Sequence, residues 1–131
     1  MGFKRPPMME YKGFRDLKVY QLSSQLAIKV YEISKSFPKE EKYALTDQVR
    51  RSSRAVSALI AEAWAHRKYP KSFVSKLVDS KGEADETEVW IDFAEAHSYI
   101  DKEKQQYLLE KYNEVGKMLN SMINQPEKFC H

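Results

Sequence analysis

Residues 45–63 read LTDQVRRSSRAVSALIAEA, and this stretch decides the fold. One stripe recurs through it every three or four residues: Leu45, Val49, Ser52, Val56, Leu59 or Ile60, and Ala63. At about 100° per residue, its apolar members point within about 60° of one direction, as on the buried face of a helix. The stretch therefore predicts an amphipathic helix, which we expect to begin near Pro38 and to end before Pro70.

Three other stretches show the same periodicity. The first is expected to begin at Asp16 as its N-cap and to end at Pro38. Another runs from about residue 71 to residue 99, with Gly82 weakening it locally. The last is expected to begin at Asp101 as its N-cap and to stop before Pro126.

Four helices with short connections and no strand-like segment predict an all-α fold, an antiparallel up-down-up-down four-helix bundle. We expect the bundle to span residues 14–124, between an N-terminal extension (1–13) and a C-terminal tail (125–131). With 131 residues, the chain is long enough for one domain with one core.

The composition is that of a folded protein with two oppositely charged halves. Residues 1–71 hold 15 Lys and Arg against 7 Asp and Glu, a net charge of +8, whereas residues 72–131 hold 7 against 12, a net charge of −5. A basic half can attract a polyanion, and an acidic half can pair with a basic one. The single Cys130, the lack of a long apolar run and the lack of a secretory signal lead us to expect a cytoplasmic protein.

Three arginines interrupt the decisive stretch. Projection places Arg50 and Arg54 near the pole opposite the apolar stripe, with Arg51 beside them. Three roles stay open for them: solvated surface, ion pairs with an acidic row in residues 71–99, or contacts with nucleic-acid phosphates. The acidic row consists of Asp79, Glu83, Glu86, Asp92 and Glu95. The nucleic-acid role would include a further basic group: Arg67, Lys68 and Lys71.

The outer face of the same helix continues as small residues. Small side chains permit the close approach of another helix, although alanine is also simply a good helix former. A flanking tryptophan is better buried in a contact than left exposed. These residues are therefore a candidate oligomer interface: Ser57, Ala58, Ala61, Glu62, Trp64 and Ala65.

Catalytic and metal constellations are missing from the sequence. A di-metal site in a helical bundle needs Glu-x-x-His pairs, but Ala63 and Ala94 stand three residues before His66 and His97. Glu62 and His66 are four residues apart, yet two ligands do not make a site. Since Gly-rich phosphate loops and nucleophile elbows are also missing, we expect a non-enzymatic protein without metal or cofactor.

Several segments resemble the four-helix bundle family known as ribosomal RNA intervening-sequence proteins. They are FRDLKVYQLS at 14–23, FPKEEKYALTDQVRRSS at 37–53, IAEAW at 60–64 and FVSKLVDSKGEADETEVWIDFAEAHSYI at 73–100. The resemblance covers nearly the whole chain, from Phe14 to about Ile123. One departure is that the family commonly reads Asn-Ile-Ala-Glu-Gly where this chain reads LIAEA at 59–63, which favours helix packing over chemistry there.

The resemblance implies an antiparallel bundle that assembles as a ring-like homopentamer, encoded in some bacteria within insertions in ribosomal RNA genes. It also implies a kinship with accessory proteins of diversity-generating retroelements, which are basic pentamers that bind nucleic acid and a reverse transcriptase. Two functions follow. The first is an oligomer that binds the backbone of RNA or DNA through the arginines. The second is an oligomeric scaffold for a partner protein such as a reverse transcriptase, with the arginines used in salt bridges between subunits.

Overall fold

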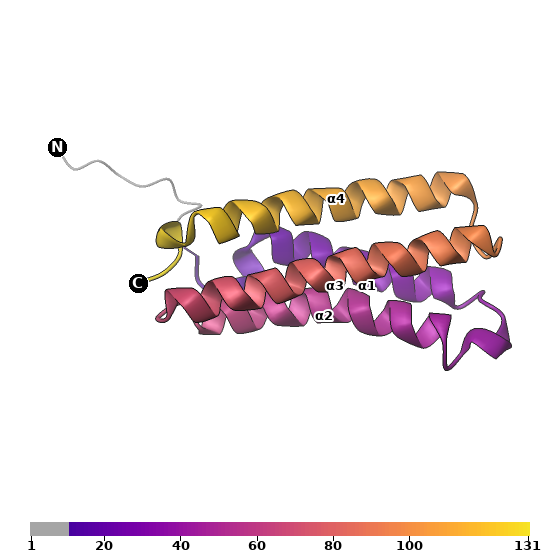
Figure 1. Cartoon of the computed structure of the whole chain (residues 1–131), viewed down its shortest axis with the longest axis horizontal. Helices are drawn as coiled ribbons and strands as arrows, with labels where there is room; N and C mark the ends of the chain where they lie inside the picture. Colours follow the sequence, from indigo (N-terminus) through magenta and orange to yellow (C-terminus); the bar gives the residue numbers. More distant parts are fainter. Residues whose placement is uncertain (1–10) are drawn as a thin grey trace.

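Four long helices joined by short connections make up the computed structural model, which describes residues 11–131. They are α1 (Lys18–Ser34), α2 (Leu45–Ala65), α3 (Pro70–Ala96) and α4 (Lys102–Asn124). Since residues 11–131 contain no strand, the all-α prediction is confirmed. Consecutive helices run in alternating directions (Figure 1), and close backbone contacts join α1 to α2 and α4 and join α3 to α2 and α4, which is consistent with the up-down-up-down arrangement.

The predicted stripe of α2 faces the core. Its residues are buried, with Val56, Ile60 and Ala63 fully enclosed, and Ile60 instead of the half-buried Leu59 takes the position that the sequence left open. Opposite them lie large apolar side chains of the other helices, among them Phe73 and Tyr112. No helix within residues 11–131 is long and apolar enough to span a bilayer.

The contact between α2 and α3 is made by small residues with buried hydroxyl groups. Ser52 of α2 and Ser80, Ala84 and Thr87 of α3 are each at most 1% exposed. Ser80 Oγ donates to the carbonyl oxygen of Val56 at 2.8 Å, and Thr87 Oγ1 donates to Ser52 Oγ at 2.8 Å. Because each buried hydroxyl has a partner, the small side chains permit close packing without an unpaired polar group.

Of the two predicted N-caps, Asp101 is confirmed and Asp16 is not. Asp101 is the N-cap of α4, and its carboxylate accepts a hydrogen bond from Lys104 N at 2.8 Å, as predicted. The prediction for Asp16 was wrong. This residue ends the 3-10 turn η2 (Phe14–Asp16), its carboxylate accepts a hydrogen bond from Lys12 N at 2.7 Å, and Leu17 is the N-cap of α1.

Helix α2 begins later than predicted, at Leu45 instead of near Pro38. The intervening residues form the 3-10 turn η3 (Lys39–Glu41). The carboxylate of Glu41 accepts from Leu45 N at 3.2 Å and from the hydroxyl of Tyr99 at 2.9 Å. Glu41 therefore satisfies a free N–H at the start of α2 and ties this start to the connection between α3 and α4.

Both ends of the described chain pack on the bundle. The ring of Tyr11 lies 5.5 Å from that of Trp64 and 6.1 Å from that of Phe129, and Phe129 also stacks on Phe73. The predicted tail thus folds back through the 3-10 turn η4 (Pro126–Lys128), whereas most of the predicted N-terminal extension, residues 1–10, lies outside the described residues.

Gly82 lies on the exposed side of α3, where a methyl group has room. A Cβ atom at this position would meet no atom within 4 Å. We expect Gly82→Ala to raise the free energy of unfolding by about 0.4–1 kcal/mol, because alanine restricts the unfolded chain and favours helix. Urea denaturation measures the change. A variant no more stable than the parent would contradict this account of Gly82.

Ser98 adopts a left-handed backbone conformation that is unfavourable for residues other than glycine. Ser98 has φ 63° just after α3 ends, where Tyr99 N donates to Ala94 O at 2.8 Å and Ser98 N donates to Glu95 O at 2.9 Å. This is a Schellman motif, in which glycine suits the left-handed residue best.

We expect Ser98→Gly to stabilise the protein by up to about 1 kcal/mol, because glycine removes the steric cost of a positive φ. Thermal unfolding of Ser98→Gly beside Ser98→Ala provides the measurement. The alanine variant keeps the strain and should show no gain, so equal stabilisation by both variants would rule out the backbone explanation.

Candidate nucleic-acid interface

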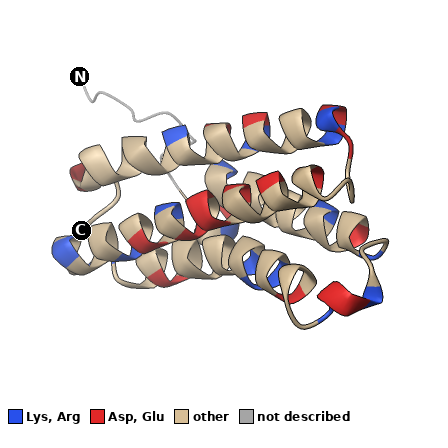
Figure 2. Cartoon of the chain, turned by 45° about the vertical axis from the view of Figure 1, so that its right-hand side comes forward, with Lys and Arg blue, Asp and Glu red and all other residues tan. Residues whose placement is uncertain are grey.

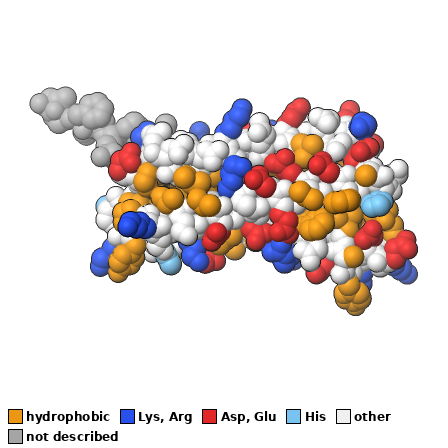
Figure 3. Space-filling view, in the orientation of Figure 1, with side chains coloured by type: hydrophobic (Ala, Val, Ile, Leu, Met, Phe, Trp, Pro, Cys, Tyr) orange, Lys and Arg blue, Asp and Glu red, His pale blue; other side chains and the backbone are white. Residues whose placement is uncertain are grey.

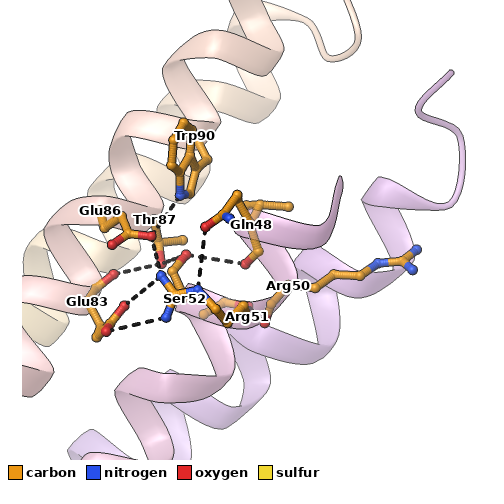
Figure 4. A network of polar contacts seen from close by, with 10 residues as sticks. Gln48, Arg50, Arg51, Ser52, Glu83, Glu86, Thr87 and Trp90 are labelled. Carbon is orange, nitrogen blue, oxygen red and sulfur yellow. Dashed lines mark hydrogen bonds and ion pairs between the residues drawn. The ribbon is translucent and has the colours of Figure 1, made fainter. Parts of the chain in front are cut away.

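The three neighbouring arginines of α2 point to different sides of the helix. In Figure 4, Arg51 lies toward α3, whereas Arg50 extends away from α3. Arg51 and Arg54 are exposed, and Arg50 is half-buried. The cluster read from the sequence is therefore two groups with different neighbours.

Arg51 is held by carboxylates of the same chain. Its guanidinium lies 3.3 Å from Glu83 Oε1 and forms a close ion pair with Glu86. Glu86 in turn accepts a hydrogen bond from Trp90 Nε1 at 3.0 Å. The hydrogen bonds that Arg51 donates to Glu83 and then to Glu86 raise the pKa of Arg51 above its usual value. Arg51 thus has the second of its three predicted roles, an ion pair with the acidic row on α3.

Arg50 and Arg54 rest on a tyrosine of α1 instead. The guanidinium carbons lie 4.4 Å and 5.4 Å from the centre of the Tyr31 ring. Arg50 Nε also donates to Ser34 Oγ at 2.7 Å, and Ser34 is buried. Cation–π contacts of this kind are worth about 0.5–1 kcal/mol when exposed, enough to favour one side-chain position.

Neither Arg50 nor Arg54 has an ion pair within residues 11–131. Lys35 also lies near the ring of Tyr31, at 5.2 Å, but it pairs with Glu32 at 3.2 Å. The face formed by α1 and α2 therefore presents two guanidinium groups that form no ion pair with a carboxylate of the described chain. Figure 2 shows these basic turns of α2 in blue and the acidic residues along α3 in red.

The second basic group lies toward the other end of α2. Arg67 covers the ring of Trp64 at 3.7 Å and donates through Nε to the carbonyl oxygen of Trp64 at 3.0 Å. Lys68 and Lys71 are exposed. At about 1.5 Å per residue, the end of α2 lies about 16 Å from Arg54 along the helix, so the two basic groups do not form one compact site.

The reason for placing Trp64 at an oligomer interface was wrong, because the chain itself buries this side chain. Trp64 is 8% exposed and packs against Tyr11 and Arg67. Glu62 pairs with Lys76 of α3 at 3.2 Å.

The remaining small residues on the outer face of α2 divide between two environments. Ser57 serves the contact between α1 and α2, where its hydroxyl lies 2.8 Å from that of Ser23 and 3.3 Å from that of Ser24. Ala58 and Ala65 stay exposed, and Ala61 is half-buried. Only these alanines still present a small, unoccupied helix surface.

Sequence reasoning missed Tyr31 and Ser34, the residues that position Arg50. Both lie on α1, and nothing in a single sequence pairs them with a particular turn of α2. A weaker signal was available for Trp90, which stands four residues after Glu86 and so shares its helix face.

The chemistry of the described residues is that of ionic and stacking contacts. No group of three or more His, Cys, Asp or Glu residues within 11–131 could hold a metal ion. His66, one of the candidate ligands considered above, shares a hydrogen bond with Ser72. The geometry of the arginines suits anion binding through charge and hydrogen bonds.

Comparison with known proteins identifies relatives of the whole bundle. The sequence model described as 23S rRNA-intervening sequence protein matches residues 15–121. A crystal structure of a protein of unknown function from the S23 ribosomal protein family of Bacteroides thetaiotaomicron is similar, with a TM-score of 0.73 and 28% sequence identity. The similarity covers 81% of this chain and 95% of that one. No curated protein sequence matches the chain.

The contacts of Arg51 predict a small, salt-dependent effect on stability. The side chain is 47% exposed, so we expect Arg51→Met to lower the free energy of unfolding by less than about 1 kcal/mol, and by less still in 1 M salt. Urea denaturation at two salt concentrations tests this. Arg54→Met, which removes a charge without a carboxylate partner, is the control and should show no salt-dependent loss. A loss of several kcal/mol for Arg51→Met would mean that its ion pairs are effectively buried.

Proposed function

This chain belongs to the 23S rRNA-intervening sequence protein family, and from this we propose that it is a non-enzymatic homo-oligomer that binds the backbone of RNA or DNA. Its number of subunits would be five, as the resemblance implies. The observation that carries the proposal is the pair Arg50 and Arg54, which lie on Tyr31 and have no carboxylate partner within the described chain.

Arg50 is arranged to bind an anion. Its Nε–H is used on Ser34, which leaves the two terminal nitrogens of the guanidinium for a phosphate. Contact with Tyr31 restricts the side chain before any ligand arrives, so less conformational entropy is lost on binding. Arg54 lies on the same ring and adds a second charge one helical turn away.

The proposed binding recognises the charge of the nucleic-acid backbone and not the base sequence. Arginines on the convex surface of a bundle reach phosphates more readily than base edges, which lie inside the grooves of a duplex. Assembly strengthens such contacts, because several copies of the pair on one particle make the later contacts intramolecular. Lys68, in the connection after α2, and Lys71, in the first turn of α3, are exposed and would extend the basic surface along the nucleic-acid strand.

A second candidate function is an oligomeric scaffold for a partner protein, with arginines in salt bridges between subunits. The pairing of Arg51 with Glu83 and Glu86 favours it, because the acidic row of α3 accepts arginine within one chain. The same chemistry can join α2 of one copy to α3 of another. The two candidates assign Arg50 and Arg54 to different partners, which makes them separable by experiment.

We expect the double variant Arg50→Gln/Arg54→Gln to lose affinity for single-stranded RNA and to flatten its dependence on salt. Each lost phosphate contact should reduce the slope of log K against log salt concentration by about 0.7. Fluorescence anisotropy of a labelled RNA over a range of salt concentrations measures both quantities. Light scattering should give the same mass for the variant as for the parent.

The control is Lys117→Gln/Lys128→Gln, which removes the same charge from exposed residues outside α2 that have no ion pair within residues 11–131. Its affinity should stay close to that of the parent. A parent protein that retains no RNA even at low salt contradicts the nucleic-acid function. An Arg50/Arg54 variant that falls to monomers supports the scaffold with arginines between subunits.

A further inference from the structure

A groove lies between the start of α2 and the end of α3, at the end of the bundle away from the described termini (Figure 1). It has a volume of about 280 Å³ and is lined mainly by Leu45 and Gln48 of α2 and by Trp90, Phe93 and His97 near the end of α3. Such a volume, at the small end of the range for ligand pockets, suits one large apolar side chain.

The walls of the groove are apolar and already in place. The ring of Phe93 lies 6.1 Å from that of Trp90 and 6.3 Å from that of His97, yet Phe93 stays 49% exposed. The hydrogen bond from Trp90 to Glu86 fixes the indole without any ligand. Figure 3 shows hydrophobic side chains gathered on the right-hand part of this face, with acidic side chains among them.

The helix that forms one wall of the groove is strongly acidic in its second half. Residues 82–101 hold seven Asp and Glu and no Lys or Arg. Glu41 lines the groove, and Glu86 supports Trp90 from beside it. Arg51 offsets only part of this charge, since Glu83 and Glu86 share it. A complementary occupant therefore carries positive charges next to a large apolar side chain.

The chain itself contains a segment of this chemistry. Residues 1–5 read MGFKR, in which the aromatic Phe3 is followed directly by Lys4 and Arg5, and the first acidic residue is Glu10. This segment lies outside the described residues. An aromatic anchor with two adjacent cations matches an apolar groove surrounded by carboxylates.

The distances along the chain favour the groove of a second copy. Tyr11 packs on Trp64, and the groove includes Leu45, about 28 Å away along α2 at about 1.5 Å per residue. The eight steps along the chain from Phe3 to Tyr11 span at most about 29 Å when fully extended, and about 16 Å as a flexible chain. Reaching the groove of its own chain would thus require the longest and least probable conformation.

We propose that residues 3–5 of one copy dock in the groove between α2 and α3 of a second copy, with Phe3 between Trp90 and Leu45 and with Lys4 and Arg5 beside the carboxylates of Glu41 and Glu86. The proposal rests on the self-association proposed above. It gives the acidic half of the chain a role distinct from that of the basic face on α1 and α2.

Photo-crosslinking of the full-length chain tests this docking. Benzoylphenylalanine replaces Phe3, the protein is prepared as an equal mixture of ¹⁴N- and ¹⁵N-labelled copies, and crosslinked peptides are mapped by mass spectrometry. We expect mixed-isotope crosslinks from position 3 to residues 41–48 or 90–97. Lys4→Glu/Arg5→Glu and, separately, Phe93→Ser should abolish them, whereas Tyr107→Ser, at an exposed aromatic residue of α4, should not.

The contrary outcomes are distinct. Mixed-isotope crosslinks to other surfaces, or crosslinks confined to one chain, overturn the docking while leaving self-association intact. A crosslink yield that Lys4→Glu/Arg5→Glu does not change overturns the role of charge, and this variant leaves residues 11–131 untouched, so misfolding of the bundle cannot explain its effect. A monomeric mass by light scattering at all concentrations overturns the self-association itself, and the docking with it.

Discussion

The close contact between α2 and α3 is the constraint on which the other features depend. Ser52, Ser80, Ala84 and Thr87 are so small that a hydroxyl group of α3 reaches the backbone of α2, and another pairs with a hydroxyl group across the contact. Each hydrogen bond of this kind adds only about 1 kcal/mol in net terms, but an unpaired buried hydroxyl would cost as much or more. The pairs therefore fix which turn of α2 faces which turn of α3.

This register decides the partners of the arginines. Once Ser52 lies against Thr87, the neighbouring Arg51 is placed beside Glu83 and Glu86, which precede Thr87 by four residues and by one. Arg50, one residue earlier, lies about 100° further around the helix and reaches Tyr31. Of the three arginines that lie close together in the sequence, Arg51 is therefore paired with carboxylates, whereas Arg50 and Arg54 form no ion pair within the described chain.

Periodicity and caps predicted the parts of the fold that are local. The stripe from Leu45 to Ala63 and the N-cap at Asp101 depend on residues within a few turns of one another. The failures came from distant partners. Glu41 bonds both to Leu45 and to Tyr99, and Tyr99 follows Glu41 by 58 residues. Glu41 itself lies in a 3-10 turn, where the local pattern predicted α-helix. Trp64 was expected to need another subunit for its burial. Tyr11 and Phe129 help to enclose this end of the bundle, but they lie in segments that were predicted to be an extension and a tail.

The arginines beside Tyr31 and the carboxylates of α3 act nearly independently at physiological ionic strength. A helix is about 10 Å across, and the Debye length is about 8 Å in 0.15 M salt. The carboxylates of α3 on the far side of α2 therefore repel a phosphate beside Tyr31 only weakly. In 0.01 M salt the Debye length grows to about 30 Å, and all the acidic residues of the bundle act on the same phosphate. Affinity for a polyanion should consequently rise less steeply at very low salt than the count of arginines alone implies, because the acidic face then opposes the basic one.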